Sequence, residues 1–264
     1  MRWLVGVALL MSACGRFGFS ETRTDASTEP EDASDAAPDT PDVIGGRVLL
    51  VSMDDVATGN AMVATSDPTL TIACDAHCPG PIEGKRNNGY HIGDDHYFTI
   101  HRPELLTAAP YTVGFWLRTP PTTTGSQDCV SKPYGATTAG DISSVWIGMD
   151  GAVTYETTAN GAPLQNDNIT LSVIASDNQW HYLAATWDGA VKRVYADGSE
   201  AHSDETKVQT VIDSSEPIEI GRDLDFAGPV HYLLGDMDEL VFYDRALTAA
   251  EIAMLPAIYS AQGN

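Results

Sequence analysis

The sequence predicts an all-β domain folded as a two-sheet antiparallel sandwich, and three observations support this prediction. Short apolar or alternating segments recur over about 210 residues without a strand–helix–strand rhythm. Three Asp-Gly pairs join such segments, at Asp150-Gly151, Asp188-Gly189 and Asp197-Gly198. These pairs predict tight hairpins, because primed turns need positive φ. The 43% hydrophobic content is too high for a wholly disordered chain.

In chain order, we expect strands at residues 47–53, 70–73, 89–92, 97–101, 111–118, 145–149, 152–156, 169–174, 180–187, 191–196, 216–220, 230–234 and 238–243. Segment 111–118 is the clearest example, because its apolar residues alternate. One face of this strand should carry Tyr111, Val113, Phe115 and Leu117. The other face should carry Trp116.

One short helix is expected near the C-terminus, at residues 248–255. Thr248 can cap it, and Glu251 lies three residues later, as a capping box requires. We expect Pro256 to end this helix.

The charge balance excludes one class of partner. The chain has 14 Lys and Arg against 37 Asp and Glu, a formal net charge of -23. Binding to nucleic acid requires a basic surface that neutralises phosphates, and the sequence shows none. No apolar run reaches the length of about 18 residues that a membrane-spanning helix needs.

The first 14 residues have the features of an export signal. Arg2 precedes the apolar stretch 4–11, and small residues lead to Cys14. The run Met11-Ser12-Ala13-Cys14 resembles a bacterial lipoprotein signal, with Met11 in place of the usual leucine. This resemblance implies an acylated Cys14, and Gly15 after it favours an outer-membrane location in the cell envelope. An ordinary cleaved signal followed by a free cysteine is the alternative.

Residues 15–42 are expected to form a disordered acidic tether. Residues 20–42 contain eight acids, one Arg, three Pro and no large apolar residue, so they cannot bury enough surface to offset the entropy of ordering. A linker with no requirement beyond length remains an alternative. The folded domain is then residues 43–264.

Several runs in this domain carry a resemblance to a known family. They are Trp180–Gly189, Val194–Gly198, Ile220–Asp223 and Gly235–Thr248. They resemble the laminin-G-like, concanavalin A-like lectin/glucanase jelly rolls, over nearly all of residues 43–255. The resemblance implies a jelly-roll sandwich, and it leaves function open, because this fold carries sugar-binding modules, protein-binding modules and glycosidases alike.

The resemblance also implies a structural Ca²⁺ ion held by Asp54 and Asp238. Carboxylates and carbonyls on loops can supply the six to eight oxygens that Ca²⁺ needs. Asp67 is a weaker addition to this set, and Asp55 can replace Asp54 if the register differs by one. In the alternative interpretation, Asp54 and Asp238 pair with Arg245 or with backbone amides.

Catalytic residues are not expected. The glucanases of this superfamily carry acids at positions i, i+2 and i+4 of one strand. The nearest match, Asp236–Leu240, lacks the third acid, and alternation should place Glu239 on the opposite face. A glycoside hydrolase is therefore the least favoured function.

The cysteines and histidines are interpreted as structural. Cys74 and Cys78 are expected to form a local disulfide, and Cys129 to be a buried free thiol on a strand, with a Cys74–Cys129 pair as the alternative. The evenly spaced histidines are expected to be ordinary surface residues rather than a metal site. They are His91, His96 and His101.

Four tryptophans could form a sugar-stacking platform: Trp116, Trp146, Trp180 and Trp187. Core packing is favoured for most of them. Tyr134, with the loop 120–126, is the candidate ligand contact at the rim. We therefore predict a non-catalytic, surface-anchored module that recognises extracellular carbohydrate, with binding to a surface protein as the alternative.

Overall fold

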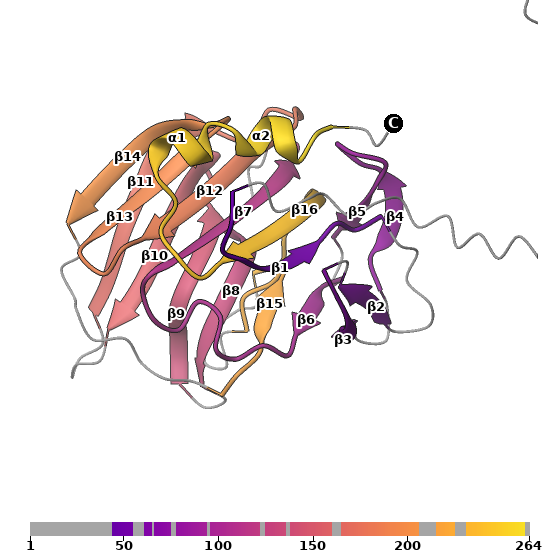
Figure 1. Ribbon diagram of the computed structural model, residues 1–264, viewed down its shortest axis with the longest axis horizontal. Coiled ribbons are helices and arrows are strands. Elements are labelled where there is room, and N and C mark those ends of the chain that lie inside the picture. Colours follow the sequence, from indigo (N-terminus) through magenta and orange to yellow (C-terminus); the bar gives the residue numbers. More distant parts are fainter. Residues whose placement is uncertain are drawn as a thin grey trace, which may run out of the picture. The chain divides into compact units, whose positions relative to one another are not determined.

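The computed structural model describes residues 44–54, 61–64, 66–74, 78–93, 96–121, 125–135, 138–159, 165–205, 215–224 and 231–261. Within these residues, sixteen strands form two sheets of eight strands each (Figure 1). Every strand pairing found there is antiparallel. The expected signal sequence, residues 1–14, and tether, residues 15–42, lie outside the described residues.

One sheet, called sheet A, is centred on β7. Its strands in spatial order are β14 (Ser199–Glu205), β13 (Val191–Ala196), β12 (His181–Trp187), β7 (Tyr111–Arg118), β16 (Gly235–Tyr243), β5 (Asn88–Ile92) and β4 (Gly80–Glu83). Strand β1 (Arg47–Val51) also pairs with β16. The first and last strands of the chain are therefore neighbours (Figure 1).

The other sheet, sheet B, contains the longest strands. Its order is β11 (Gln165–Ile174), β10 (Ala152–Ala159), β9 (Thr138–Ile147), β8 (Gln127–Gly135), β15 (Ile218–Ile220), β6 (Phe98–Ile100), β3 (Asp67–Ala73) and β2 (Ala61–Ala64). The all-β, two-sheet fold is thus confirmed.

Alternation along β7 produces two separate hydrophobic clusters. Val113, Phe115 and Leu117 pack in the main core, where buried side chains of sheet B also lie. Trp116 points the other way, into a second cluster that includes Ile252 of the C-terminal segment. The expected division of faces is confirmed, and it leaves sheet A buried on both sides.

The three predicted Asp-Gly hairpins are all present. They connect β9 to β10, β12 to β13, and β13 to β14. Asp197 and Gly198 have φ of 51° and 79°, the positive values that a primed turn needs at both central residues. A side chain at Gly198 would also collide with the C-terminal segment, because its Cβ would lie 3.1 Å from Cα of Ala253.

The C-terminal segment differs from the prediction in one respect. Helix α1 (Ala249–Ile252) begins at the Thr248 cap with the expected capping box. Pro256, however, does not end the helical segment, because it lies in the first turn of α2 (Leu255–Ile258). A proline is tolerated there, since the first backbone N–H groups of a helix have no intrahelical acceptor.

Residues 230–234, predicted as a strand, are described only from His231 onward. There they form one isolated bridge, between Arg222 and Tyr232. Among the described residues, no helix has the length and apolar character needed to cross a bilayer.

Glu251 joins the capping box to an ion pair. Its carboxylate accepts hydrogen bonds from Arg245 Nη2 at 2.7 Å and from the backbone N–H of Thr248 at 2.8 Å. The hydrogen bonds from Arg245, and then those from Thr248, lower the pKa of Glu251 to about 2. Glu251 therefore stabilises the segment that covers sheet A.

We predict that Glu251→Ala lowers the free energy of unfolding by about 1 kcal/mol at neutral pH, the usual effect of losing a helix cap. Because folding lowers the pKa of Glu251 from 4.5 to about 2, the difference from the wild type should be full above pH 4.5 and shrink as the pH falls toward 2. Denaturant unfolding across this range measures it.

Two control variants separate the contributions. Glu251→Gln keeps the capping box and loses only the charge, so it should cost less than Glu251→Ala. Glu200→Gln removes an exposed carboxylate that lies 4.0 Å from Arg193, and it should change little. A loss in Glu251→Ala that does not depend on pH would contradict the assignment.

Candidate functional site

The C-terminal segment covers the middle of the outer face of sheet A, so the outer face of sheet B is the more open surface for a ligand. Ile252, Leu255 and Tyr259 of the C-terminal segment pack over Trp116 and Tyr182 of sheet A. Figure 1 shows α1 and α2 running along this side of the sandwich. No comparable apolar layer lies on the outer face of sheet B among the described residues.

Polar side chains line the outer face of sheet B. Val145, Ile147 and Val153 point into the main core, so the residues between them point outward. On this outer face Thr154 and Thr170 exchange a hydrogen bond at 2.9 Å. The outer face is therefore suited to contact with a polar ligand.

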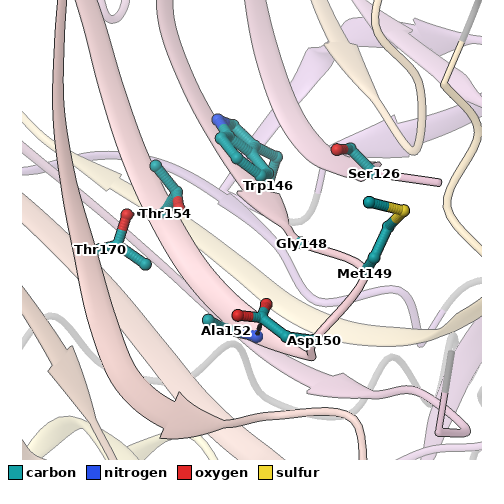
Figure 2. Close-up of a pocket in the computed structure, with 8 residues that line it drawn as sticks. All are labelled: Ser126, Trp146, Gly148, Met149, Asp150, Ala152, Thr154 and Thr170. Atoms are coloured by element: carbon teal, nitrogen blue, oxygen red, sulfur yellow. Dashed lines mark hydrogen bonds between the residues drawn. The ribbon is translucent and has the colours of Figure 1, made fainter. Parts of the chain in front are cut away.

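A hollow of about 380 Å³ lies on this face at the β9–β10 hairpin (Figure 2). We call it the Trp146 pocket. It is lined by Ser126, Trp146, Gly148, Met149, Asp150, Ala152, Thr154 and Thr170. In Figure 2 the ring of Trp146 lies between the two threonines on one side and Ser126 and Met149 on the other. The pocket thus combines an aromatic face with hydroxyl groups and a carboxylate.

Local sequence explains the form of the pocket. Trp146 is partly exposed because alternation along β9 turns it outward, away from the core. Gly148 leaves room for the turn, since a Cβ there would lie 2.8 Å from Asp150 Oδ1. That oxygen accepts a hydrogen bond from the backbone N–H of Ala152 at 3.1 Å, which fixes Asp150 at the end of the pocket.

Glu156 links the pocket to the rest of the sheet. Burial raises its pKa, and side-chain hydrogen bonds from Asn168 and Trp146 oppose that rise. The Trp146 ring is thus held by a neighbour on β10 rather than left to rotate freely.

A second hollow, of about 320 Å³, lies beside the C-terminal segment. Asp188, Arg193 and Glu200 are among the residues that line it. Arg193 Nη1 lies 3.0 Å from Asp188 Oδ2, so its main polar groups already bind each other. It contains no exposed aromatic face, and the Trp146 pocket is the better candidate.

The two residues expected to hold calcium lie close together in sheet A. Asp54 follows β1, Asp238 lies on β16, and β1 pairs with β16. Asp54 Oδ1 accepts a hydrogen bond from the backbone N–H of Asn88 at 3.2 Å. Asp238 Oδ2 accepts one from the backbone N–H of Arg86 at 2.9 Å. One oxygen of each carboxylate therefore pairs with a backbone amide, as in the alternative interpretation.

The second oxygen of Asp238 suits a cation. Asp238 Oδ1 is buried and has no hydrogen-bond partner. Burial raises the pKa of Asp238 to about 9; the Arg86 amide opposes this rise, and the charges of Glu239 and Asp54 add to it. The donor set therefore fits a Ca²⁺ ion in its chemistry.

The other residues considered for calcium do not join this pair. Asp67 lies on β3 of sheet B, where its Oδ1 accepts hydrogen bonds from the N–H and hydroxyl of Thr69. Asp55 lies outside the described residues. Arg245 pairs with Glu251.

The expectation for Glu239 was wrong. The pairing of β16 with β7 shifts register between Asp238 and Val241, and Glu239 has φ of 51°. This bulge inserts one residue, so Asp238 and Glu239 both contact Arg86 rather than point to opposite faces. Both acids are fully buried, at 0% exposure, which prevents them from reaching a glycosidic bond.

Tyr134, the expected rim contact, is partly buried on β8 and does not line the Trp146 pocket. It lies roughly 25 Å along the strand from Ser126. Ser126, at the end of the expected 120–126 loop, does line the pocket.

Of the four tryptophans, Trp116 and Trp187 are core residues at 5% and 4% exposure, whereas Trp146 and Trp180 are partly exposed. His91 lies in sheet A, and His101 follows β6 of sheet B, so these histidines do not converge.

The structure also contains the expected Cys74–Cys78 disulfide, with Cα atoms 5.0 Å apart. Cys129 is a buried free thiol, and burial raises its pKa well above the usual range.

Comparison with known protein families shows to which superfamily the chain belongs. The model of the concanavalin A-like lectin/glucanases superfamily matches residues 92–253. The chain belongs to this superfamily. Its sequence matches none of the curated proteins with which it was compared.

Solved structures with this fold include binding domains of clostridial toxins. The binding domain of Paraclostridial Mosquitocidal Protein 1 aligns with a TM-score of 0.61 at 15% identity, over 80% of this chain and 51% of that one. The binding domain of botulinum neurotoxin DC in complex with rat synaptotagmin II gives 0.58 at 13%, over 81% and 52%. The same domain in complex with SialylT gives 0.59 at 13%, over 81% and 51%.

These similarities show a shared fold. The chain spans about half the length of each of these domains.

Proposed function

We propose that this chain is a non-catalytic module that binds extracellular carbohydrate in the Trp146 pocket. The observation that carries this proposal is the partly exposed Trp146 ring in a hollow of about 380 Å³, next to two threonine hydroxyls. Sugar rings have C–H faces that pack on an aromatic plane, and their hydroxyls need polar partners. The exposed Thr170 and Asp150 supply such partners, and the buried Thr154 positions Thr170 through their 2.9 Å hydrogen bond.

The negative charge of the chain and of the pocket disfavours anionic ligands. The chain has a net charge of -23, and Asp150 stands at one end of the pocket while Glu156 lies beside Trp146. An anionic sugar would be repelled by this field. A neutral glycan is therefore the ligand we propose.

Binding to a surface protein is the alternative. Met149 is 64% exposed at the pocket and Leu234 is 44% exposed elsewhere, and exposed apolar side chains are typical of protein contacts. The similar binding domain of botulinum neurotoxin DC has been solved in complex with a protein, rat synaptotagmin II, and in complex with SialylT. Competition by free sugar separates the two functions, since it should release a glycan-bound module only.

We predict that Trp146→Ala weakens binding to neutral glycans on an array about tenfold or more, which corresponds to about 1.4 kcal/mol. Unfolding should change little, because the ring is not part of the core. Trp180→Ala is the matched control: Trp180 is also partly exposed, but it lies against Arg118 of sheet A. Equal glycan binding by Trp146→Ala and the wild type would exclude this pocket.

We also propose that Ca²⁺ binds between Asp54 and Asp238 as a structural ion. The buried, unpartnered Asp238 Oδ1 supports this proposal. Such an ion would neutralise two adjacent carboxylates and connect the end of β1 to β16.

We predict that saturating Ca²⁺ raises the melting temperature relative to EDTA, by about 2 to 4 °C for each kcal/mol of binding free energy. Asp54→Asn should abolish this rise. Asp67→Asn, which changes an aspartate away from the pair, should retain it. Melting temperatures that do not respond to Ca²⁺ in the wild type would contradict the site.

We propose that Cys14 is acylated and holds the module on the outer membrane of the cell envelope, with residues 15–42 as a tether. The support is the Met11–Cys14 run, since acyl chains contribute about 0.8 kcal/mol per buried CH₂ to membrane binding.

We predict that Cys14→Ser moves the protein from the detergent phase to the aqueous phase in a phase-partition assay and removes incorporation of labelled palmitate. Met11→Leu restores the usual signal residue, so this variant should still be labelled. Palmitate labelling that persists in Cys14→Ser would place the lipid elsewhere.

A further inference from the structure

A second group of potential metal ligands lies on sheet B, apart from Asp54 and Asp238. Asp128 lies on β8, Asp223 follows β15, and His231 begins the next described segment. Their ligand atoms all lie within 4.8 Å of one another. We call these three residues the sheet B cluster.

Backbone hydrogen bonds bring the cluster together. The N–H of Gly221 donates to the carbonyl of Cys129 at 2.9 Å, which fixes the chain after β15 beside β8. The N–H of Asp223 donates to the carbonyl of His231 at 3.1 Å. Gly221 has φ of 86°, and a Cβ there would lie 2.4 Å from Ile92 Cγ2. The approach of Asp223 to Asp128 thus depends on this glycine.

The distances inside the cluster suit a shared ion better than direct contacts. His231 Nδ1 lies 3.8 Å from Asp128 Oδ2 and 3.9 Å from Asp223 Oδ2. Hydrogen bonds of this kind are about 2.7–3.2 Å long. Ligands that share an ion at about 2.0–2.2 Å lie roughly 3 to 4 Å apart. The imidazole nitrogen therefore stands at the separation that a common ion would require.

The state of Asp128 is an independent indication of a ligand. Its side chain is only 6% exposed. Its one hydrogen bond among the described residues comes from Ser144 Oγ to Oδ1, at 3.3 Å. Oδ2, the oxygen nearer His231, accepts none there. A carboxylate side chain that is this deeply buried and accepts one long hydrogen bond is costly unless a cation or a proton compensates for its charge.

The surrounding charge favours a cation. The carboxylates of Asp141 and Asp223 add negative charge around the buried Asp128. A divalent ion would neutralise this crowding. The side chain of His231 is 37% exposed, so an ion can reach the cluster from solvent.

We propose that Asp128, Asp223 and His231 bind a divalent transition-metal ion of the Zn²⁺ class. An imidazole nitrogen with two carboxylate oxygens suits Zn²⁺, whereas Ca²⁺ prefers oxygen ligands alone. Three protein ligands leave a coordination position for water or for an oxygen of a bound molecule.

The cluster lies next to the Trp146 pocket. Asp128 and Trp146 are directly opposite each other in the β8–β9 pairing, and residues paired in this way project from the same face of a sheet. The ion would therefore lie on the same face of sheet B as the Trp146 ring. Binding of the ion does not depend on the proposed glycan and is measured without one.

The test is titration of the metal-free full chain with Zn²⁺ by calorimetry. We expect one equivalent to bind to the wild type. His231→Ala and Asp128→Asn should each weaken this binding at least tenfold. His91→Gln is the matched control, because His91 contacts a single carboxylate, that of Asp236, at 2.7 Å in sheet A. The His91→Gln variant should bind Zn²⁺ as tightly as the wild type.

A second control separates this site from the calcium site. Asp54→Asn should leave Zn²⁺ binding unchanged. Co²⁺ can replace Zn²⁺ as a spectroscopic probe, because its visible absorption depends on the ligands bound to it. This absorption should change in His231→Ala, which removes the nitrogen ligand. Should Asp128→Asn fail to fold, His231→Ala decides the result. No binding to the wild type, or Zn²⁺ binding within twofold of wild type in His231→Ala, would overturn the proposal.

Discussion

The packing of sheet A on both faces is the constraint on which the position of the Trp146 pocket depends. The inner face of sheet A meets sheet B, and its outer face is closed by the C-terminal segment. There Trp116 Nε1 donates to the carbonyl of Tyr259 at 2.9 Å, and the hydroxyls of Tyr243 and Tyr259 lie 2.8 Å apart. These bonds satisfy the polar atoms of side chains that are otherwise buried. Because the middle of the outer face of sheet A is closed, the outer face of sheet B is the more open surface for a ligand.

Local patterns predicted most of the fold because the determinants are local. Alternation in residues 111–118 and the Asp-Gly pairs depend on neighbours along the chain, and both matched the structure. The bulge at Asp238 and Glu239 was missed, because its cause is the pairing of β16 with β7 rather than the sequence of β16 itself. Pro256 was misjudged because α1 already ends at Ile252, and a proline is tolerated in the first turn of the helix that follows.

The candidate sites were harder to predict, because each assembles residues distant in sequence. Trp146 was one of four tryptophans considered for a stacking platform, with core packing favoured for most of them. The alternation of Val145 and Ile147 around Trp146 already indicates an outward side chain. The sheet B cluster had no comparable signal. Asp128 and His231 are separated by about a hundred residues, and only the pairing of β15 with β8 brings their segments together. The pair Asp54 and Asp238 was found through family resemblance, which supplies long-range proximity that spacing cannot.

The pairing of β1 with β16 limits when sheet A can form during folding. Leu50 and Val241 are direct partners in this ladder, so the central strands of sheet A join the two ends of the domain. Contacts between such distant segments form slowly, since a long loop must close before they contribute. During synthesis, sheet A therefore cannot be completed until β16 has emerged. Until then, the apolar edge of β1 is open to other chains, and the cell must keep it from aggregating.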